Sequence, residues 1–170
     1  DPAVELTKFL DELKESNFTT AAKTEYTFKG NENRFERLNM KSDKYFNAGL
    51  ILIDFKKWKQ LDITSKLILN LKSNAIDLIY WDQDLLNNFF DGQYLEISNS
   101  LNANLDLENS STDLNQAIFI HFYGKSKPWV GRGLYTKNSK VYQEEYRKFS
   151  KYLYHIEHRW IRSSIVDLLK

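Results

Sequence analysis

The apolar run YFNAGLILIDF at residues 45–55 constrains the fold more than any other feature of the chain. A nearly continuous apolar run of this length, with one glycine, is typical of a strand that is buried on both faces of an α/β sheet. A second run, AIFIHF at 117–122, predicts another buried strand. Shorter strand-like segments lie at 18–22 and 94–97. We therefore expect an α/β fold.

Three further segments have apolar residues at helical spacing. They are residues 3–15, the segment that follows Asp62, and residues 81–90, where acids precede the apolar part. Asp62 is expected to cap its helix. Residues 29–44 and 98–116 are polar and lack a period, so we expect two long loops there. Long loops inside compact domains are often functional.

Length and composition exclude several classes of protein. A chain of 170 residues predicts one domain with a sizeable core. It has no cysteine, which excludes a cysteine nucleophile, a thiolate zinc site and disulfides, and which fits a reducing compartment. No apolar run approaches the ~20 residues of a membrane span, and residues 1–5 lack the basic start of a signal peptide. We therefore expect a cytoplasmic protein.

The charge of the chain is distributed unevenly. Residues 1–121 carry 13 Lys+Arg and 19 Asp+Glu, whereas residues 122–170 carry 11 and 4, so their net charges are −6 and +7. Such asymmetry favours an anionic partner for the second part. No nucleic-acid-binding motif accompanies the basic residues, so we expect no nucleic acid among the partners.

We expect residues 1–138 to form the body of the protein and residues 139–170 to form a basic aromatic tail of one long helix or two consecutive helices. Apolar residues recur there every three or four positions: Tyr142, Tyr146, Phe149, Leu153, Ile156 and Trp160. One interpretation is that this stripe packs on the body. The other is that its aromatic residues, mixed with Lys and Arg, dock peripherally on the anionic inner membrane.

Three short segments could carry chemistry, namely FNAG at 46–49, DQD at 82–84 and HFYGKSKPW at 121–129, and each also has a structural interpretation. The DQD sequence at 82–84 begins a predicted helix, so Asp82 either caps that helix or faces a ligand. His121 ends a predicted strand, so it is either a core histidine or a metal ligand. The FNAG segment at 46–49 could be a tight entry into its strand.

The turn after His121 favours a ligand. Gly124 allows close approach of backbone to a bound group, and Lys127 supplies a point positive charge that suits phosphate. In open α/β sheets, ligands bind beyond the carboxyl ends of strands. An imidazole and an ammonium group at such a strand end would suit a metal-bound diphosphate.

Taken together, the order and spacing of three stretches resemble the glycosyltransferase family 8 pattern. These stretches are YFNAGLILIDFKKWKQLDI (45–63), YWDQDLLNNFF (80–90) and IHFYGKSKPW (120–129), and the resemblance covers roughly residues 18–130. The likeness is in particular to the bacterial lipopolysaccharide galactosyl- and glucosyltransferases, because a basic aromatic tail follows. It implies a GT-A type, Rossmann-like mixed sheet flanked by helices, with a C-terminal helical tail.

The resemblance also implies an activity, which is transfer of a hexose from a UDP-sugar to an acceptor sugar with retention of configuration, in the synthesis of lipopolysaccharide or another cell-surface glycan. At the diphosphate end, His121 corresponds to a manganese ligand of the family. Lys127 and the backbone at Gly124 correspond to contacts with the nucleotide diphosphate.

At the sugar end, the resemblance assigns four positions. Asn47 and Ala48 correspond to contacts with the donor and acceptor sugars. Asp82 corresponds to the residue that holds hydroxyls of the donor sugar, and Gln83 to the amide placed under the anomeric carbon.

The sequence departs from the family pattern in one respect. Family members carry an Asp-x-Asp motif ahead of this region, and the two acids supply most of the metal ligands, but no Asp-x-Asp precedes FNAG here. We therefore expect the chain to be the C-terminal portion of a larger enzyme and to be inactive alone. The alternative is a non-catalytic carbohydrate-binding or membrane-associated scaffold.

Overall fold

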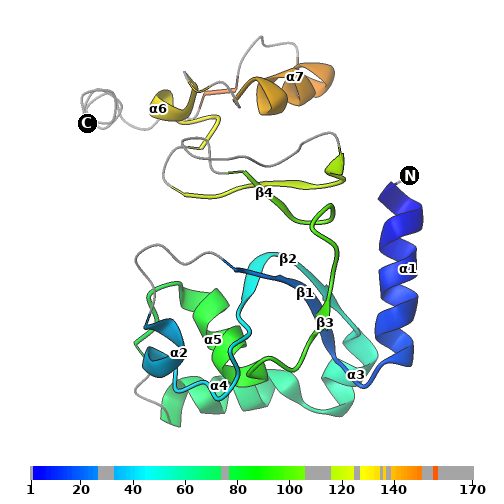
Figure 1. Ribbon diagram of the computed structural model, residues 1–170, viewed down its shortest axis with the longest axis vertical. Helices are drawn as coiled ribbons and strands as arrows, with labels where there is room; N and C mark the ends of the chain where they lie inside the picture. The colour runs from blue at the N-terminus through cyan, green and yellow to red at the C-terminus, as the bar shows by residue number, and fades with distance from the viewer. Residues whose placement is uncertain are drawn as a thin grey trace. The chain divides into compact units, whose positions relative to one another are not determined.

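The computed structural model describes most of the chain, in two compact units that divide between Asn102 and Ala103 (Figure 1). The described residues are 2–26, 33–73, 77–105, 116–124, 127–134, 136, 139–150 and 155–156. Unit 1 ends at Asn102 and unit 2 begins at Ala103, and each is considered by itself. The expected boundary between residues 138 and 139 stays a prediction.

Unit 1 contains a three-stranded mixed sheet with β1 in the middle (Figure 1). The strands are β1 (Thr20–Thr24), β2 (Phe46–Ile53) and β3 (Leu95–Glu96), in the order β2-β1-β3. β1 pairs antiparallel with β2 and parallel with β3. A bulge between Ala22 and Lys23 shifts the register, so that Lys23 lies opposite Asn47. The predicted α/β class with a mixed sheet is confirmed.

Five helices accompany this sheet among the described residues of unit 1. They are α1 (Pro2–Glu15), α2 (Arg34–Arg37), α3 (Phe55–Gln60), α4 (Ile63–Ser73) and α5 (Trp81–Phe90). α1, α4 and α5 confirm the three predicted helices. α2 interrupts the predicted loop at 29–44. α3 was not predicted, and it begins because the Asp54 carboxylate accepts a hydrogen bond from the Lys57 backbone N–H at 3.0 Å.

The core of unit 1 lies between the sheet and helices α3 to α5. Its buried cluster contains Ala22, Phe46, Ile63, Phe90 and Tyr94. The Phe46 ring meets the Tyr94 ring edge-on at 5.0 Å and lies 6.5 Å from the Phe90 ring. Phe46 therefore fixes the start of β2 against α5, which is the geometry on which the candidate site depends.

The expected burial of β2 on both faces is correct only at its start. Phe46 and Asn47 are buried, but Gly49 is exposed and Ile53 is 42% exposed. Within the described part of unit 1 the helical core cluster covers one face of this strand, so its later residues alternate between core and solvent.

Unit 2 contains a two-stranded parallel pair, β4 (Ala103–Leu105) and β5 (Ile120–Phe122), and two helices, α6 (Gly131–Leu134) and α7 (Ser139–Phe149). β4 lies inside the segment that was expected to be a loop. β5 occupies only the second half of the predicted strand at 117–122.

The expected single long helix over 139–170 is wrong. α7 ends at Phe149, and Ser150, His155 and Ile156 are not helical. Phe149 is 89% exposed and Ile156 is 44% exposed. Leu153 and Trp160, two further residues of the apolar stripe, lie outside the described residues, as do residues 157–170, so a second helix stays a prediction.

Two tyrosines of the stripe pack within unit 2. The Tyr142 ring lies 4.9 Å from the Trp129 ring, and the Tyr146 ring stacks on the His155 ring at 4.7 Å. The structural interpretation of the stripe is therefore correct for Tyr142, whose partner Trp129 belongs to the body, whereas Tyr146 stacks on a residue of the tail itself. No helix within the part of the chain that the structure describes is long and apolar enough to cross a bilayer.

Candidate active site

Helix α5 and the start of β2 are joined by an amide side chain. Asn87 of α5 accepts a hydrogen bond from the Phe46 backbone N–H at 2.7 Å and donates one to the Phe46 carbonyl at 2.9 Å. The side chain thus pairs with the strand as a neighbouring strand would. It brings the FNAG and DQD segments, which lie far apart in the sequence, into contact.

Gln83 is held at this junction through both ends of its carboxamide. Its Oε1 accepts a hydrogen bond from the Ala48 backbone N–H at 2.9 Å, and its Nε2 donates one to the Tyr45 hydroxyl at 3.2 Å. Two residues that the sequence assigned to one sugar-binding end, Ala48 and Gln83, are therefore in direct contact.

Asp82 stands beside Gln83 with an exposed side chain. The capping interpretation of Asp82 is wrong, because α5 begins at Trp81 and its N-cap position is Tyr80. Trp81 adopts a φ of +47°, an uncommon value for a bulky residue. Among the residues that the structure describes, none is a hydrogen-bond partner of the Asp82 carboxylate.

The second acid of the DQD sequence, Asp84, is fully buried and accepts four hydrogen bonds from three residues. The Arg37 guanidinium donates to both of its oxygens at 3.0 and 3.3 Å, the Tyr45 hydroxyl donates at 2.6 Å, and the Tyr80 backbone N–H donates at 2.8 Å. Burial alone would raise the pKa of Asp84, but the hydrogen bonds from Arg37, Tyr45 and Tyr80 and the charge of Arg37 outweigh it and lower the pKa. Asp84 is therefore an ionised, fully paired structural carboxylate.

Asn47 is turned into unit 1 and is 4% exposed. Its Nδ2 donates to Glu25 at 2.7 Å, and its Oδ1 accepts from the Gly49 N–H at 2.8 Å and from the Asn102 Nδ2 at 3.0 Å. The Lys23 ammonium donates to the Asn102 carbonyl at 3.0 Å. The predicted sugar contact of Asn47 is untested, and the observed role of its side chain is to tie the start of β2 to its neighbours.

Sequence reasoning did not find Lys23, Glu25, Arg37 or Tyr45. The first two lie on or just after a short strand with no motif, and Arg37 lies in a polar segment without a period. Tyr45 was counted among the apolar residues of a predicted strand, because it begins the run at 45–55. The one available signal was its place directly before FNAG.

In unit 2, the turn after β5 has the features that the sequence suggested. Gly124 has a φ of +79°, which favours glycine, and its Cα faces open space. The Lys127 ammonium folds back and donates to the Phe122 carbonyl at the end of β5. Partial burial lowers the pKa of Lys127. The His121 ring lies 6.4 Å from the Tyr123 ring.

The described residues do not form a metal centre. Across the described ranges, no group of three or more His, Asp and Glu side chains could hold a metal ion, so His121 is not part of such a group there. Asp82 and His121 belong to different units, so the expectation that they face a common cleft stays a prediction.

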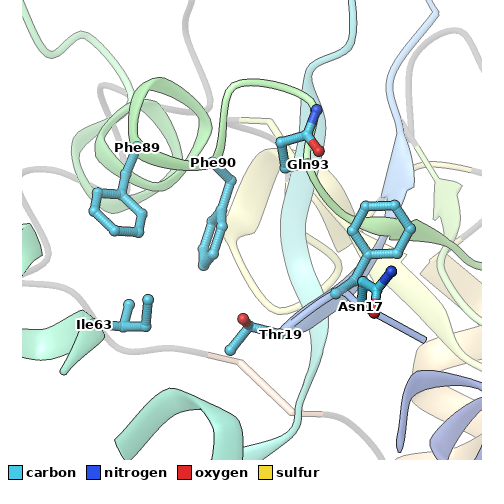
Figure 2. A pocket seen from close by; sticks show the side chains of 7 residues that line it. Asn17, Thr19, Ile63, Phe89, Phe90 and Gln93 are labelled. Atoms are coloured by element: carbon cyan, nitrogen blue, oxygen red, sulfur yellow. The ribbon is translucent and has the colours of Figure 1, made fainter. Parts of the chain in front are cut away.

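An open pocket of about 260 Å³ lies at the other end of α5 (Figure 2). It is lined by Asn17, Phe18, Thr19, Ile63, Phe89, Phe90 and Gln93. Figure 2 shows the rings of Phe89 and Phe90 and the side chain of Ile63 around it. None of the predicted site residues lines this pocket, so the polar junction at Gln83 is a separate feature.

Comparison with known proteins identifies the family. The sequence model of glycosyl transferase family 8 matches residues 4–132, which contain the whole junction between β2 and α5. The chain belongs to glycosyl transferase family 8. The predicted family is thereby confirmed.

Curated relatives of this family 8 chain include two bacterial proteins. General stress protein A of Bacillus subtilis (strain 168) is 33% identical over 141 residues, which cover 72% of this chain and 47% of that protein. Lipopolysaccharide 1,3-galactosyltransferase of Salmonella typhimurium is 32% identical over 99 residues, which cover 54% and 29%. The chain therefore spans about half the length of these relatives or less.

Solved structures show the same fold. The galactosyltransferase LgtC in complex with donor and acceptor sugar analogues matches with a TM-score of 0.64 and 21% identity, over 94% of this chain and 60% of that one. The bifunctional glycosyltransferase WbbM, in its apo structure, matches with a TM-score of 0.61 and 18% identity, over 95% and 32%. The GT-A type fold expected for a family 8 chain is confirmed.

Proposed function

We propose that this family 8 chain takes part in the transfer of a hexose from a UDP-sugar to a hydroxyl of an acceptor glycan, with retention, at the N-terminus of α5. One observation carries the proposal. The Gln83 carboxamide is fixed by Ala48 and Tyr45 directly beside Asp82, whose carboxylate is exposed and unpartnered in the described part of the chain.

Asp82 and Gln83 have different chemical roles in this proposal. The free Asp82 carboxylate accepts hydrogen bonds from hydroxyls of the donor sugar and so positions it. The Gln83 oxygen already accepts from the Ala48 N–H, which reduces its basicity. A neutral amide engaged in this way is a poor nucleophile. We therefore favour a front-face reaction in which Gln83 stabilises positive charge at the anomeric carbon rather than attacking it.

At the diphosphate end, we propose that Lys127 and the Gly124 backbone contact the nucleotide diphosphate. Cleavage of the bond to the sugar leaves negative charge on the departing UDP, and a nearby ammonium group stabilises that charge. We also propose His121 as one ligand of Mn²⁺. His121 belongs to no group of three or more His, Asp and Glu among the described residues, so a metal bound there would need further ligands.

The acceptor is proposed to be a growing glycan of lipopolysaccharide or of another cell-surface polymer. Two relatives support this substrate class, namely the lipopolysaccharide 1,3-galactosyltransferase and a lipopolysaccharide 1,2-glucosyltransferase of Escherichia coli. Exposed basic residues of α7 would hold the enzyme peripherally on the cytoplasmic face of the inner membrane.

The proposal is tested by Asp82→Asn in the full-length protein, with Asp11→Asn as a matched exposed acid of unit 1. We expect Asp82→Asn to lower sugar transfer by about 100-fold or more while the affinity for UDP is retained. Asp11→Asn should have no effect. Transfer at the wild-type rate by Asp82→Asn would overturn the assignment and favour a non-catalytic sugar-binding scaffold.

His121 is tested separately. His121→Ala should raise the Mn²⁺ concentration needed for half-maximal activity, and His155→Ala, a histidine of the aromatic cluster in unit 2, should not. An unchanged metal requirement in His121→Ala would remove this residue from the metal site.

A further inference from the structure

We propose that Arg37, Asp84 and Tyr45 form a positioning relay that fixes which end of the Gln83 carboxamide faces which neighbour, and that turnover depends on this orientation. The inference rests on the proposed function for its catalytic half only. Its structural half concerns the direction of hydrogen bonds and is testable without any reaction.

The relay starts with a charge. Arg37 lies on α2, and its guanidinium binds Asp84 through both carboxylate oxygens, with the side chain of Arg37 only 7% exposed and that of Asp84 0% exposed. A buried carboxylate so paired stays ionised, and an ionised carboxylate accepts hydrogen bonds but donates none.

The second step assigns the proton of Tyr45. The Tyr45 hydroxyl lies 2.6 Å from Oδ1 of Asp84. Two oxygens this close must share a hydrogen, and the ionised Asp84 has none, so Tyr45 is the donor. Burial, followed by the hydrogen bond to Asp84, raises the pKa of Tyr45 well above its usual range, so the phenol keeps this proton.

The third step orients Gln83. Because the one proton of Tyr45 points at Asp84, its oxygen can only accept from Gln83, so Nε2 must face it at 3.2 Å. On the other side, the Ala48 N–H can only donate, so Oε1 must face it at 2.9 Å. A reversed carboxamide would oppose two donors on one side and two acceptors on the other. One Nε2 proton and one lone pair of Oε1 remain for a substrate, in fixed directions.

The fixed direction of these hydrogen bonds gives the buried Arg37–Asp84 pair a role, although the residue that it orients through Tyr45, Gln83, is neutral. Without Asp84 as an obligatory acceptor, Tyr45 could donate to Gln83 instead, and a reversed carboxamide would then be opposed only by the Ala48 N–H. Arg37 and Asp84 never contact the substrate in this proposal. They act through Tyr45, and they are therefore positioning residues.

The decisive variants are Tyr45→Phe and Asp84→Asn in the full-length protein. The control is Tyr94→Phe, a buried tyrosine whose hydroxyl binds Thr24 at 2.7 Å and takes no part in the relay. The Asp84→Asn side chain keeps the shape of the carboxylate, and its amide nitrogen can donate to Tyr45 instead of accepting from it. At either oxygen position that nitrogen faces a donor of Arg37.

The first measurement is the side-chain amide resonance of Gln83 in ¹⁵N-glutamine-labelled protein, assigned by its loss in Gln83→Ala. Solvent exchange of the two Nε2 protons should become about ten-fold faster in Tyr45→Phe and Asp84→Asn and stay unchanged in Tyr94→Phe. Unchanged exchange in Asp84→Asn would overturn the relay, and this result does not depend on whether the protein transfers sugar.

The second measurement is steady-state transfer. Both relay variants should lower kcat by about 100-fold, the effect of a misplacement of ~1 Å, with the KM for the donor within about two-fold. Altered exchange with unchanged kcat would overturn the catalytic half. Absence of transfer by the wild-type protein would instead refute the proposed function and leave the relay decided by the exchange data.

Discussion

The two units attach a crossing segment to a helix by different means. In unit 1, the segment before β2 is held on α5 by a buried ion pair and directional hydrogen bonds around Asp84. In unit 2, the segment around His155 is held on α7 by stacked rings, those of Trp129, Tyr142 and Tyr146. Rings stack in several arrangements, whereas a chain of donors and acceptors has one polarity. Precise orientation is thus provided where the proposed chemistry lies.

The two units nevertheless share one feature, an amide side chain that binds both backbone groups of a distant residue. Gln143 of α7 accepts from the His155 N–H at 2.8 Å and donates to the His155 carbonyl at 3.0 Å, just as Asn87 of α5 does with Phe46. In each case an amide side chain satisfies both backbone groups of one distant residue. The difference between the units therefore lies in what surrounds this device, which is charge in one and aromatic rings in the other.

The largest effect is expected for Arg37→Met, which tests whether unit 1, unlike unit 2, depends on a buried ion pair for its stability. Removal of one partner leaves the Asp84 charge buried and partly unpaired, which costs about 3–5 kcal/mol. Urea unfolding should show this loss in Arg37→Met and a partial recovery in Arg37→Met/Asp84→Asn. A loss below about 1 kcal/mol would mean that the pair behaves like an exposed salt bridge.

The dependence of stability on acid pH also tests whether the charge of Asp84 stabilises unit 1. The folded-state pKa of Asp84 is lowered, so the stability that it contributes is complete above its unfolded pKa of about 3.9 and is lost as the pH falls through the lower folded value. The melting temperature of the wild type should therefore fall more steeply than that of Asp84→Asn between pH 5 and pH 2.5. Parallel curves would contradict the assignment.

The surface of α7 offers a test of membrane docking. Lys140, Arg147 and Lys148 are exposed there, and each basic residue near an anionic membrane contributes about 1 kcal/mol. Changing all three to Gln should reduce sedimentation with anionic vesicles, and raised salt should have the same effect. The control changes Lys56, Lys59 and Lys66 of unit 1 to Gln. Equal pelleting by both variants would refute docking through α7.

The shared amide device gives a matched pair of variants. Asn87→Ala leaves the buried N–H and carbonyl of Phe46 without these hydrogen bonds, at a cost of about 1–3 kcal/mol for each group. This loss should appear as global destabilisation of unit 1. Gln143→Ala should instead increase hydrogen exchange locally around residues 155–156. Global unfolding of unit 1 by the Gln143 variant would contradict the separation of the two units.

The smallest effect is expected at the hydroxyl of Tyr142, which lies 2.5 Å from Nδ1 of His155. Tyr142→Phe keeps the ring stack and removes one partly buried hydrogen bond, at about 0.5–1.5 kcal/mol. Thermal unfolding of unit 2 measures it. A loss larger than that of Tyr146→Leu would show that the hydrogen bond, rather than the stacking, holds this cluster.

The sequence predicted those features that depend on local spacing or on motif order. The helices at 3–15 and 81–90 followed from apolar period. The family resemblance assigned Ala48 and Gln83 to the same end of the site, but their hydrogen bond to each other was not predicted. Features made by distant residues were not predictable. Asn47 meets Asn102, which is 55 positions away, and Arg37 meets Asp84 across 47 positions.

Two errors have a physical cause as well. A polar segment without a period gave no sign of α2, because four residues are too few to show a helical repeat. The apolar stripe in the tail predicted one helix, because a pattern of spacing does not reveal where Gln143 and His155 fold the chain back.

The polar stripe of α5 has a consequence for which changes of length the protein tolerates. Besides Asp84 and Asn87, Asn88 donates to the Leu38 carbonyl at 2.6 Å and Asp91 accepts from the Ser42 N–H at 2.8 Å. The side chains of α5 that bind residues 37–46 are therefore spread along about 10 Å of the helix axis, and each fixes the position of one part of that segment. The bonds from Asn87, Asn88 and Asp91 go to backbone atoms of Phe46, Leu38 and Ser42, so these contacts do not depend on the side chains of those three residues. Inserting or deleting one residue within this stretch would instead shift every later residue away from its partner on α5.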